Sequence, residues 1–172
     1  MGKGYRFCQL NKAQKEAWLP RLFDLLHENM HVIAPSGLSY ADEKALWLSQ
    51  VSPALEKAPR QIILCFSGEA LAGFLQYYTR QELLVVEEVQ LKKPFQGTFL
   101  FFRLCKFLAS VLPEGPQIIA AYADRRNGRS IRLMEKLGMV PDPDGQQEAF
   151  ICMRGPMQRV SAFFDRQTDS CS

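Results

Sequence analysis

The segment from residue 98 to residue 112 constrains the fold more than any other part of the chain. Its apolar residues recur at helical spacing, and Leu100, Leu104, Leu108 and Val111 form one face of the expected helix. Phenylalanine and cysteine side chains widen that face until the helix is apolar almost all round. Such a helix is stable only when other elements cover it on more than one side, so we expect it to lie buried between layers.

The rest of the chain alternates between strand and helix patterns. Strands are indicated by period-two alternation or by short apolar runs, and helices by apolar residues three or four positions apart. The resulting order, β-α-α-β-β-β-α-β-α-β, predicts a mixed α/β domain with a central mixed sheet flanked by helices. The expected strands are residues 5–10, 61–66, 70–79, 83–91, 118–123 and 149–153, and the expected helices are 13–31, 41–55, 98–112 and 127–137.

The length and composition are typical of a single domain, and the net charge bears on whether the partner is a nucleic acid. The 172 residues are 47% hydrophobic and 23% charged, which is ordinary for a globular domain. A net charge of +3 gives no field strong enough to predict a nucleic-acid partner. We expect a domain over residues 1–157 and a polar C-terminal tail over residues 158–172, in which Phe163 and Phe164 are the residues able to dock.

No segment predicts export or a membrane partner. The first residues carry no apolar run typical of a secretory signal, and the apolar stretch 99–102 is too short to span a bilayer. The sequence therefore predicts a cytoplasmic protein. The cysteines are widely spaced and form no Cys-x-x-Cys pair, so we interpret them as buried thiols in a reducing compartment: Cys8, Cys65, Cys105, Cys152 and Cys171.

A capped helix near the C-terminus carries the strongest local motif. Asn127 is a suitable N-cap, and Gly138 occupies the position of a left-handed C-cap residue. The segment from Asn127 to Met139 resembles the closing motif of the GNAT superfamily of N-acetyltransferases, with Met139 in place of the usual Phe. A well-capped amphipathic helix without a ligand is the other interpretation of this pattern.

A second segment, upstream of this helix, is similar to the strand–loop–helix site for the pyrophosphate of acetyl-CoA in that family. N–H groups at a helix start can donate to a pyrophosphate where the backbone is approachable, which favours a glycine such as Gly97. Gln96 occupies the family's Arg or Gln position, whereas Phe99 replaces a second small residue. The resemblance implies acetyl-CoA as cosubstrate and no metal. The implied contacts are Val89, Gln90 and Leu91, pairing with the pantetheine arm like an added strand, and Gln96, Gly97, Thr98, Phe99, Asn127 and Ser130.

The resemblance also implies a carboxylate base that removes a proton from the amine acceptor, directly or through water. Glu87 and Glu88 lie on the strand 83–91, and strict alternation predicts opposite faces for them. Glu88 is then the better candidate to face the cleft. Glu82 is a third candidate, and a solvated or salt-bridged strand residue is the alternative for each glutamate.

The proton donor of the family is missing from its usual place. Many members protonate the leaving thiolate from a tyrosine on the last helix, and that position is Met134 here. Ser130 matches the serine of the branch that acts on ribosomal proteins and N-terminal alanines, and we place it with the catalytic candidates. Tyr122 and water are the alternative proton donors.

The stretch from His27 to His31 is a literal His-Glu-x-x-His, a pattern that can hold zinc on one helix face with Glu28 as a general base. The chain has only two histidines, and the motif ends a predicted helix beside a Pro/Gly loop, so a zinc hydrolase is the least favoured interpretation. In the GNAT resemblance the connection between the first two helices lines the acceptor pocket, which implies His31 and Tyr40 as substrate-binding residues. An exposed histidine at a helix end is the alternative.

The sequence thus predicts an N-acetyltransferase that moves an acetyl group from acetyl-CoA to a primary amine in a ternary complex. No acyl-enzyme is expected, because no cysteine is placed with a histidine relay. The acceptor, either a small molecule or a protein N-terminus, is not predicted, and a monomer and a homodimer both fit. The alternative from another class is a GNAT-fold module that binds acyl-CoA or a partner without turnover.

Overall fold

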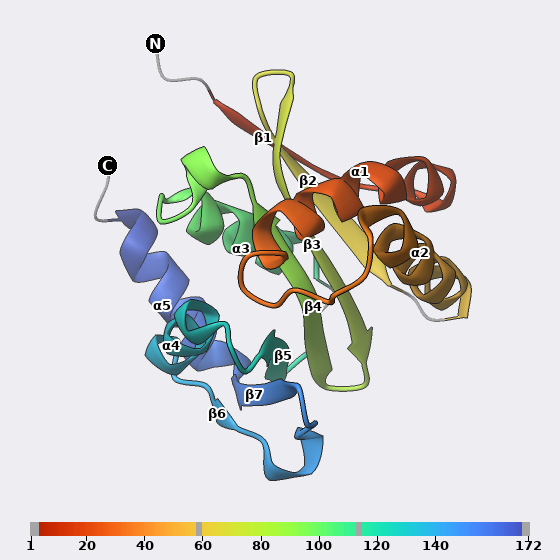
Figure 1. Ribbon diagram of the computed structural model, residues 1–172. Coiled ribbons are helices and arrows are strands. Elements are labelled where there is room, and N and C mark those ends of the chain that lie inside the picture. Colours follow the sequence, from red (N-terminus) through yellow and green to blue (C-terminus); the bar gives the residue numbers. More distant parts are fainter. Residues whose placement is uncertain (1–3, 58–59, 113–114, 170–172) are drawn as a thin grey trace.

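The computed structural model describes residues 4–57, 60–112 and 115–169. Within them, seven strands form one sheet in the order β1-β2-β3-β4-β5-β7-β6 (Figure 1). The predicted α/β class, with a central mixed sheet flanked by helices, is confirmed. The strands are β1 (Tyr5–Gln9), β2 (Gln61–Ser67), β3 (Ala70–Arg80), β4 (Leu83–Leu91), β5 (Ile118–Asp124), β6 (Val140–Pro141) and β7 (Phe150–Pro156), and the helices are α1 (Lys12–Met30), α2 (Tyr40–Lys57), α3 (Leu100–Val111), α4 (Gly128–Lys136) and α5 (Met157–Asp169).

The direction of pairing changes in the middle of the sheet. Each of the strands β1 to β4 pairs antiparallel with the next one along the chain, whereas β4 and β5 pair parallel. Strand β7 then inserts antiparallel between β5 and the short edge strand β6. A parallel pair needs a crossover connection, and here that connection contains α3.

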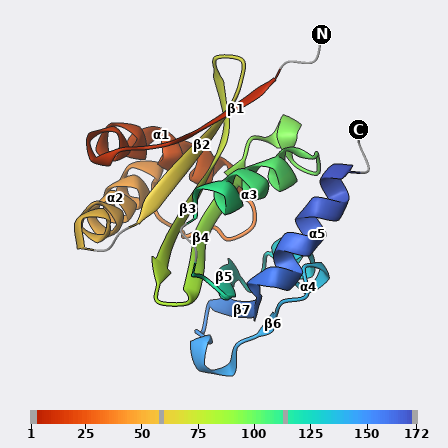
Figure 2. The same ribbon diagram turned by 180° about the vertical axis from the view of Figure 1, so that it is seen from behind.

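Helices cover the two faces of the sheet unequally. On one face, Leu22 and Leu25 of α1 pack on Ile62 of β2 and Phe74 of β3, and residues of α2 cover this core. On the other face, α3, α4 and α5 pack over β2 to β5 and β7 around Leu104. Figures 1 and 2 show the two faces in turn: α1 and α2 lie in front of the first strands, and α3 and α5 lie behind. We call these the α1/α2 face and the α3/α5 face.

The apolar helix is buried between layers, as the sequence predicted. In α3, Leu100, Leu104 and Leu108 are buried in the core on the sheet. The opposite side of α3 meets α5, where Phe101 lies 6.1 Å from Phe164 between ring centroids. The predicted bounds of this helix and of the strand after it, β5, agree with the observed bounds to within two residues.

The segment that was predicted as a polar tail from residue 158 is helical in the structure. Residues 157–169 form α5, and Phe163 and Phe164 dock on Phe102 with centroid distances of 6.0 and 6.1 Å. The short strand β6 was also missed. Residues 1–3 and 170–172, and with them Cys171 and the outer ends of the predicted domain and tail, lie outside the described residues.

The cap predictions for α4 are confirmed. Asn127 is the N-cap, and its side chain accepts a hydrogen bond from the Ser130 N–H. Gly138 has φ +82°, the left-handed conformation that ends helices. The four described cysteines are free thiols, and none of the described helices is long and apolar enough to cross a membrane.

Candidate active site

Strands β4 and β5 separate partway along their length. They pair from Leu83 to Val86 on β4, matched by Ile118 to Ala121 on β5, and the pairing stops there. Strand β4 continues to Leu91 against β3 alone. Among the strands that the structure describes, none pairs with the other edge of the stretch 87–91, and a free edge of this kind is what the GNAT resemblance implies for pantetheine.

The directions of the backbone N–H and carbonyl groups along this free edge follow from the hydrogen bonds between β3 and β4. The Lys92 N–H donates to the carbonyl of Ala72, and antiparallel pairing alternates from that point. Gln90 then turns its backbone groups toward β3, whereas Val89 and Leu91 turn theirs toward the gap. Of the three residues expected to pair with pantetheine, Val89 and Leu91 have this orientation.

A β-bulge in β4 places both glutamates on the same face of the sheet. The register shifts between Gln76 and Tyr77, and Val86 and Val89 both pack on the α3/α5 face although they are three positions apart. An unbroken strand would put residues three apart on opposite faces. The prediction that Glu87 and Glu88 point to opposite faces was wrong because the bulge adds one residue between the two valines.

Glu87 is tied into a charge pair. Arg60, which precedes β2, donates from Nε to both carboxylate oxygens at 2.7 and 3.0 Å, and from Nη2 to Oε1 at 2.9 Å. Gln76 on β3 adds a hydrogen bond of 2.9 Å from Nε2. Both members of the ion pair are only about a fifth exposed, at 21% and 22%. These donors compensate the charge of the Glu87 carboxylate and fix its position on β4.

Glu88 has a different environment. It is half-buried, and its one described hydrogen bond comes from Gln90 Nε2 at 2.9 Å. The pKa of Glu88 is raised to about 7, chiefly by burial; the hydrogen bond from Gln90 lowers this pKa, and the negative charge of Glu87 adds a smaller increase. A carboxyl with this pKa can hold or release a proton at neutral pH. Glu82, by contrast, is exposed at the β3–β4 turn, at the far end of the strand.

The loop between β4 and α3 offers free N–H groups. Gly97 has φ +74°, and the backbone N–H groups of Gly97, Phe99 and Phe101 have no acceptor within the described ranges. The Thr98 hydroxyl donates to the carbonyl of Phe95 at 2.7 Å, which closes the turn. Phe99 is 48% exposed, so its ring does not enter the core. This arrangement fits a pyrophosphate at the start of α3.

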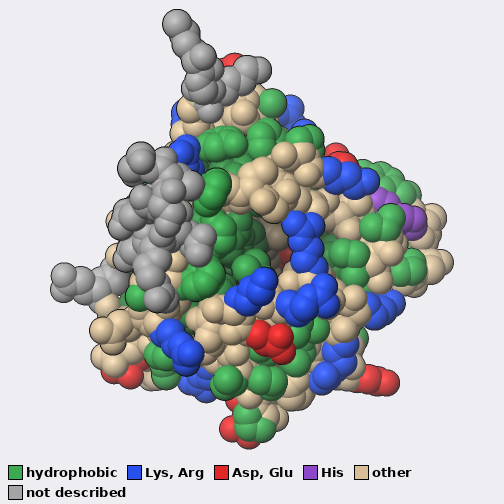
Figure 3. Space-filling model, turned by 90° about the vertical axis from the view of Figure 1, so that its left-hand side faces the viewer, with side chains coloured by type: hydrophobic (Ala, Val, Ile, Leu, Met, Phe, Trp, Pro, Cys, Tyr) green, Lys and Arg blue, Asp and Glu red, His purple; other side chains and the backbone are tan. Residues whose placement is uncertain are grey.

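The start of α4 faces this loop. Arg129 Nη1 donates to Gln96 Oε1 at 3.3 Å, and a Cβ added to Gly97 would lie 3.2 Å from Arg129 Nη2. Asn127 and Ser130 belong to the same helix start, so the structure brings both near the loop. On this side of the molecule, Figure 3 shows a hollow with Lys and Arg side chains along one rim and hydrophobic side chains on the opposite wall.

The side chain of Gln96 is held by hydrogen bonds within the protein. Its Nε2 donates to Asn29 Oδ1 at 3.0 Å and to the carbonyl of Leu91 at 2.9 Å. Asn29 Nδ2 donates to the same carbonyl at 3.0 Å. The Leu91 carbonyl is thus already engaged, which leaves the Leu91 N–H and the Val89 backbone to face the gap.

The two candidate proton donors differ in access. Met134, at the position of the usual tyrosine, is buried in the core of the α3/α5 face. Tyr122 directly follows Ala121, the last residue of β5 that pairs with β4, and it is 39% exposed. Partial burial raises the pKa of Tyr122, as does its hydrogen bond with Cys152. Its position at the separation of the strands leaves it available as a proton donor.

The two predicted acceptor contacts lie at the junction of α1 and α2. The Tyr40 hydroxyl donates to Asp24 and accepts from Lys44 Nζ at 2.9 Å. His31 is exposed and tilts against His27, with 4.9 Å between ring centroids. The loop 31–39 runs from there across the front of the sheet in Figure 1. Both side chains therefore flank that loop, and Tyr40 is held by partners of its own.

The His-Glu-x-x-His stretch does not gather a set of metal ligands. In the described part of the chain, no group of three or more His, Cys, Asp or Glu side chains is arranged to hold a metal ion. His27 Nδ1 instead lies 3.1 Å from Glu43 Oε2. Glu28 lines a separate groove along α1, described next.

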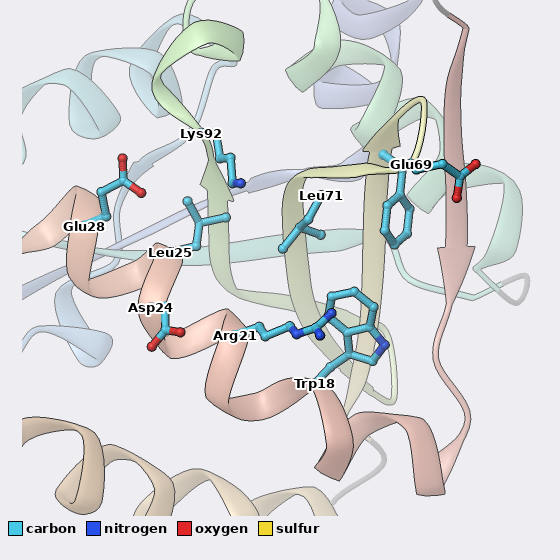
Figure 4. A pocket seen from close by; sticks show the side chains of 9 residues that line it. Trp18, Arg21, Asp24, Leu25, Glu28, Glu69, Leu71 and Lys92 are labelled. Carbon is cyan, nitrogen blue, oxygen red and sulfur yellow. The ribbon is translucent and has the colours of Figure 1, made fainter. Parts of the chain in front are cut away.

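A groove of about 350 Å³ lies between α1 and the β2–β3 turn. In Figure 4, Arg21 and Trp18 stand at one end, Lys92 and Glu28 at the other, and Leu25 and Leu71 between them. Its charges are of both signs. None of the residues predicted for the acetyl-CoA or acceptor site lines it, so it is distinct from the gap between β4 and β5.

Three polar residues of the site were missed by sequence reasoning: Asn29, Arg60 and Gln76. Asn29 and Gln76 are buried, at 9% and 5% exposed. The available signal was a polar residue at an apolar position of a helix or strand, because buried polar groups require partners. Arg60 gave no signal of its own, since a lone arginine before a strand is ordinary.

Comparison with known proteins supports the fold. No model of a protein family matches the chain, and no curated protein matches it. Solved structures do match. An acetyltransferase from Thermus thermophilus superposes with a TM-score of 0.68 and 16% identity, over 91% of this chain and 100% of its own. The PaiA N-acetyltransferase of Thermoplasma acidophilum, solved in complex with coenzyme A, gives 0.66 and 14%, over 89% and 99%.

A third structure names the class. A putative acetyltransferase of the GNAT family from Desulfovibrio desulfuricans superposes with a TM-score of 0.63 and 13% identity, over 89% of this chain and 99% of its own. The chain therefore has the fold of the GNAT acetyltransferases. The resemblance identified from the helix motif and the glycine loop is confirmed at the level of the fold.

Proposed function

We propose that the protein is an N-acetyltransferase that transfers an acetyl group from acetyl-CoA to a primary amine in a ternary complex. The observation that carries the proposal is the gap between β4 and β5, with Glu88 at its base and the free N–H groups of the Gly97 loop at its end. The PaiA structure, of the same fold, holds coenzyme A. Cytoplasmic location and the state of assembly stay predictions.

The free edge of β4 suits the pantetheine arm. Val89 presents its backbone N–H and carbonyl there and Leu91 presents its N–H, and an extended chain can pair with them as an added strand. The start of α3 supplies N–H groups and a favourable dipole for the pyrophosphate. Phe99 replaces a small residue of the family, yet its ring lies half exposed, which leaves these N–H groups approachable.

Glu88 acts as the general base in this proposal. Bound acetyl-CoA would supply a thioester whose carbonyl carbon forms a bond with the amine nitrogen as the carbon–sulfur bond breaks and its electron pair leaves on sulfur. Glu88 takes the proton that the nitrogen loses, directly or through one water. Water, or Tyr122 at the separation of the strands, returns a proton to the thiolate. Glu87 holds the bulge through its ion pair with Arg60, and Ser130 contacts the ligand.

The test is acetylation of a panel of amines by the purified protein, followed by mass spectrometry of the products. The panel includes small amines, polyamines, amino acids and short peptides with free N-termini, because the acceptor pocket is lined by loops. We expect one acetyl group added to at least one acceptor, and loss of that activity in Glu88→Gln. Acetyl-CoA binding with no acetylation of any acceptor and no thioester cleavage would favour the binding module instead.

A further inference from the structure

A buried asparagine of α1 joins the two halves of the proposed site. Asn29 lies one residue before the end of α1 and is 9% exposed. Its Nδ2 donates to Gln90 Oε1 at 2.9 Å and to the carbonyl of Leu91 at 3.0 Å, and its Oδ1 accepts from Gln96 Nε2 at 3.0 Å. All the polar atoms of its side chain are therefore engaged, each with a residue of β4 or of the loop that follows.

The network reaches the proposed base on one side. Because Asn29 occupies Gln90 Oε1, the amide of Gln90 is oriented with Nε2 toward Glu88, which it meets at 2.9 Å. An unheld glutamine could present either end of its amide. The charged groups around Glu88 are Glu87 on the same strand and Arg60, which pairs with Glu87 from the start of β2.

The network reaches the proposed pyrophosphate loop on the other side. Gln96 donates to Asn29 and to Leu91, and its Oε1 accepts from Arg129 of α4 at 3.3 Å. Gln96 immediately precedes Gly97, so these bonds fix the start of the loop whose N–H groups are free. A loop fixed before binding loses less conformational freedom when a ligand binds.

We infer that Asn29 is a positioning residue that holds the base and the acyl-CoA loop in one hydrogen-bonded arrangement, through Gln90 on one side and Gln96 on the other. The inference rests on the proposed function, because it takes Glu88 as the base and the Gly97 loop as the pyrophosphate site. Neither side of this network requires Asn29 to contact a substrate.

Three variants separate the two sides of the network, the one that reaches Glu88 and the one that reaches the Gly97 loop. Gln90→Leu removes the hydrogen bond to Glu88 and leaves the loop intact, so the pKa of Glu88 rises and coenzyme A binding stays within about twofold of the wild-type value. Gln96→Leu releases the loop and leaves Glu88 alone, so binding weakens by about tenfold, without a change at Glu88. Asn29→Leu produces both effects together.

The measurements are titration calorimetry with coenzyme A and NMR titration of the ¹³C-labelled carboxyl of Glu88 without any ligand. Glu16→Leu, an exposed position on the same helix, is the matched control and changes neither quantity. If Asn29→Leu does not fold, Asn29→Ala removes the same amide without added bulk. The inference is overturned if the folded Asn29 variant leaves the titration of Glu88 where it is in the wild type.

The inference and the proposed function fail in different ways. A wild-type protein that does not bind coenzyme A contradicts the proposed function, while the titration of Glu88 still reports on Asn29. A wild-type protein that binds, with an Asn29 variant that loses stability alone, contradicts the inference and leaves the function standing.

Discussion

Arg60 holds Glu87 by both edges of its carboxylate, from Nε at 2.7 Å and from Nη2 at 2.9 Å. The pair joins the start of β2 to the bulge of β4, two places that are 27 residues apart in the chain. It also assigns different roles to two adjacent glutamates. Glu87 is charge-compensated and structural, and Glu88 beside it is left to titrate near neutral pH.

The first prediction concerns this ion pair. Arg60→Met leaves a mostly buried carboxylate without its cation, so we expect a loss of about 1–3 kcal/mol in the free energy of unfolding, measured with urea. Adding Glu87→Gln should recover part of the loss, because the uncompensated charge is then removed. Lys44→Ala is the comparison: its partner Asp24 is 53% exposed, and the cost should stay below about 1 kcal/mol. Equal losses for the two pairs would contradict this assignment.

The second prediction is the pH dependence of acetyl transfer. Because the pKa of Glu88 is raised to about 7, the base form predominates only above that pH, and kcat/KM should rise with pH through about 7. Glu88→Gln should lower kcat by about 100-fold to 10,000-fold and abolish that limb of the profile. Glu87→Gln should keep the limb. A profile unchanged in Glu88→Gln would remove Glu88 as the base.

The third prediction concerns stability and needs no substrate. A carboxyl whose pKa is higher in the folded than in the unfolded state binds its proton more tightly when folded, so it costs stability as pH rises from about 4.5 to about 7. The free energy of unfolding of Glu88→Gln at pH 8 should therefore exceed that of the wild type. The upper limit of the difference is about 3 kcal/mol, and we expect a smaller value because Glu88 keeps some solvent contact. At pH 4 the difference should vanish. Thermal denaturation at the two pH values checks the sign.

The fourth prediction tests the loop through its glycine. Gly97→Ala places a Cβ on a left-handed residue, 3.2 Å from Arg129 Nη2, which strains the backbone by about 1 kcal/mol and crowds the start of α4. Coenzyme A binding should weaken by about tenfold. Gly68→Ala, at φ +61° in the β2–β3 turn with no atom within 4 Å, carries similar strain away from the site. It should lower stability and leave binding unchanged, and equal losses of binding would show a general effect.

The sequence carried most of the fold because its local patterns were strong. The apolar helix α3 and the capped helix α4 follow from periodicity and from Asn127 and Gly138. Helix α5 was missed because residues 158–172 are mostly polar, and its two phenylalanines, Phe163 and Phe164, were too few to indicate a helix without the aromatic side of α3. The short β6 has only two residues and forms only because β7 pairs with it.

The site was predictable in place but not in detail. The glycine loop and Asn127 predicted a place for the ligand, and the structure brings the start of α4 against that loop through Arg129 and Gln96. The faces of Glu87 and Glu88 could not be predicted, because one inserted residue in β4 reverses the alternation and no sequence pattern marks it. Arg60, Gln76 and Asn29 act through partners that are distant in the chain, such as Asn29 and Gln90, 61 positions apart. Such pairs become visible only in three dimensions.

The most direct test of the account is calorimetric titration of the wild-type protein with acetyl-CoA, with desulfo-CoA and adenosine bisphosphate as comparison ligands. The account predicts micromolar binding of acetyl-CoA and desulfo-CoA, and much weaker binding of the bisphosphate, because the free edge of β4 pairs with the pantetheine arm. Equal affinity for all three ligands would place binding outside the gap between β4 and β5. The absence of binding at millimolar acetyl-CoA would contradict the proposed function while leaving the fold unchanged.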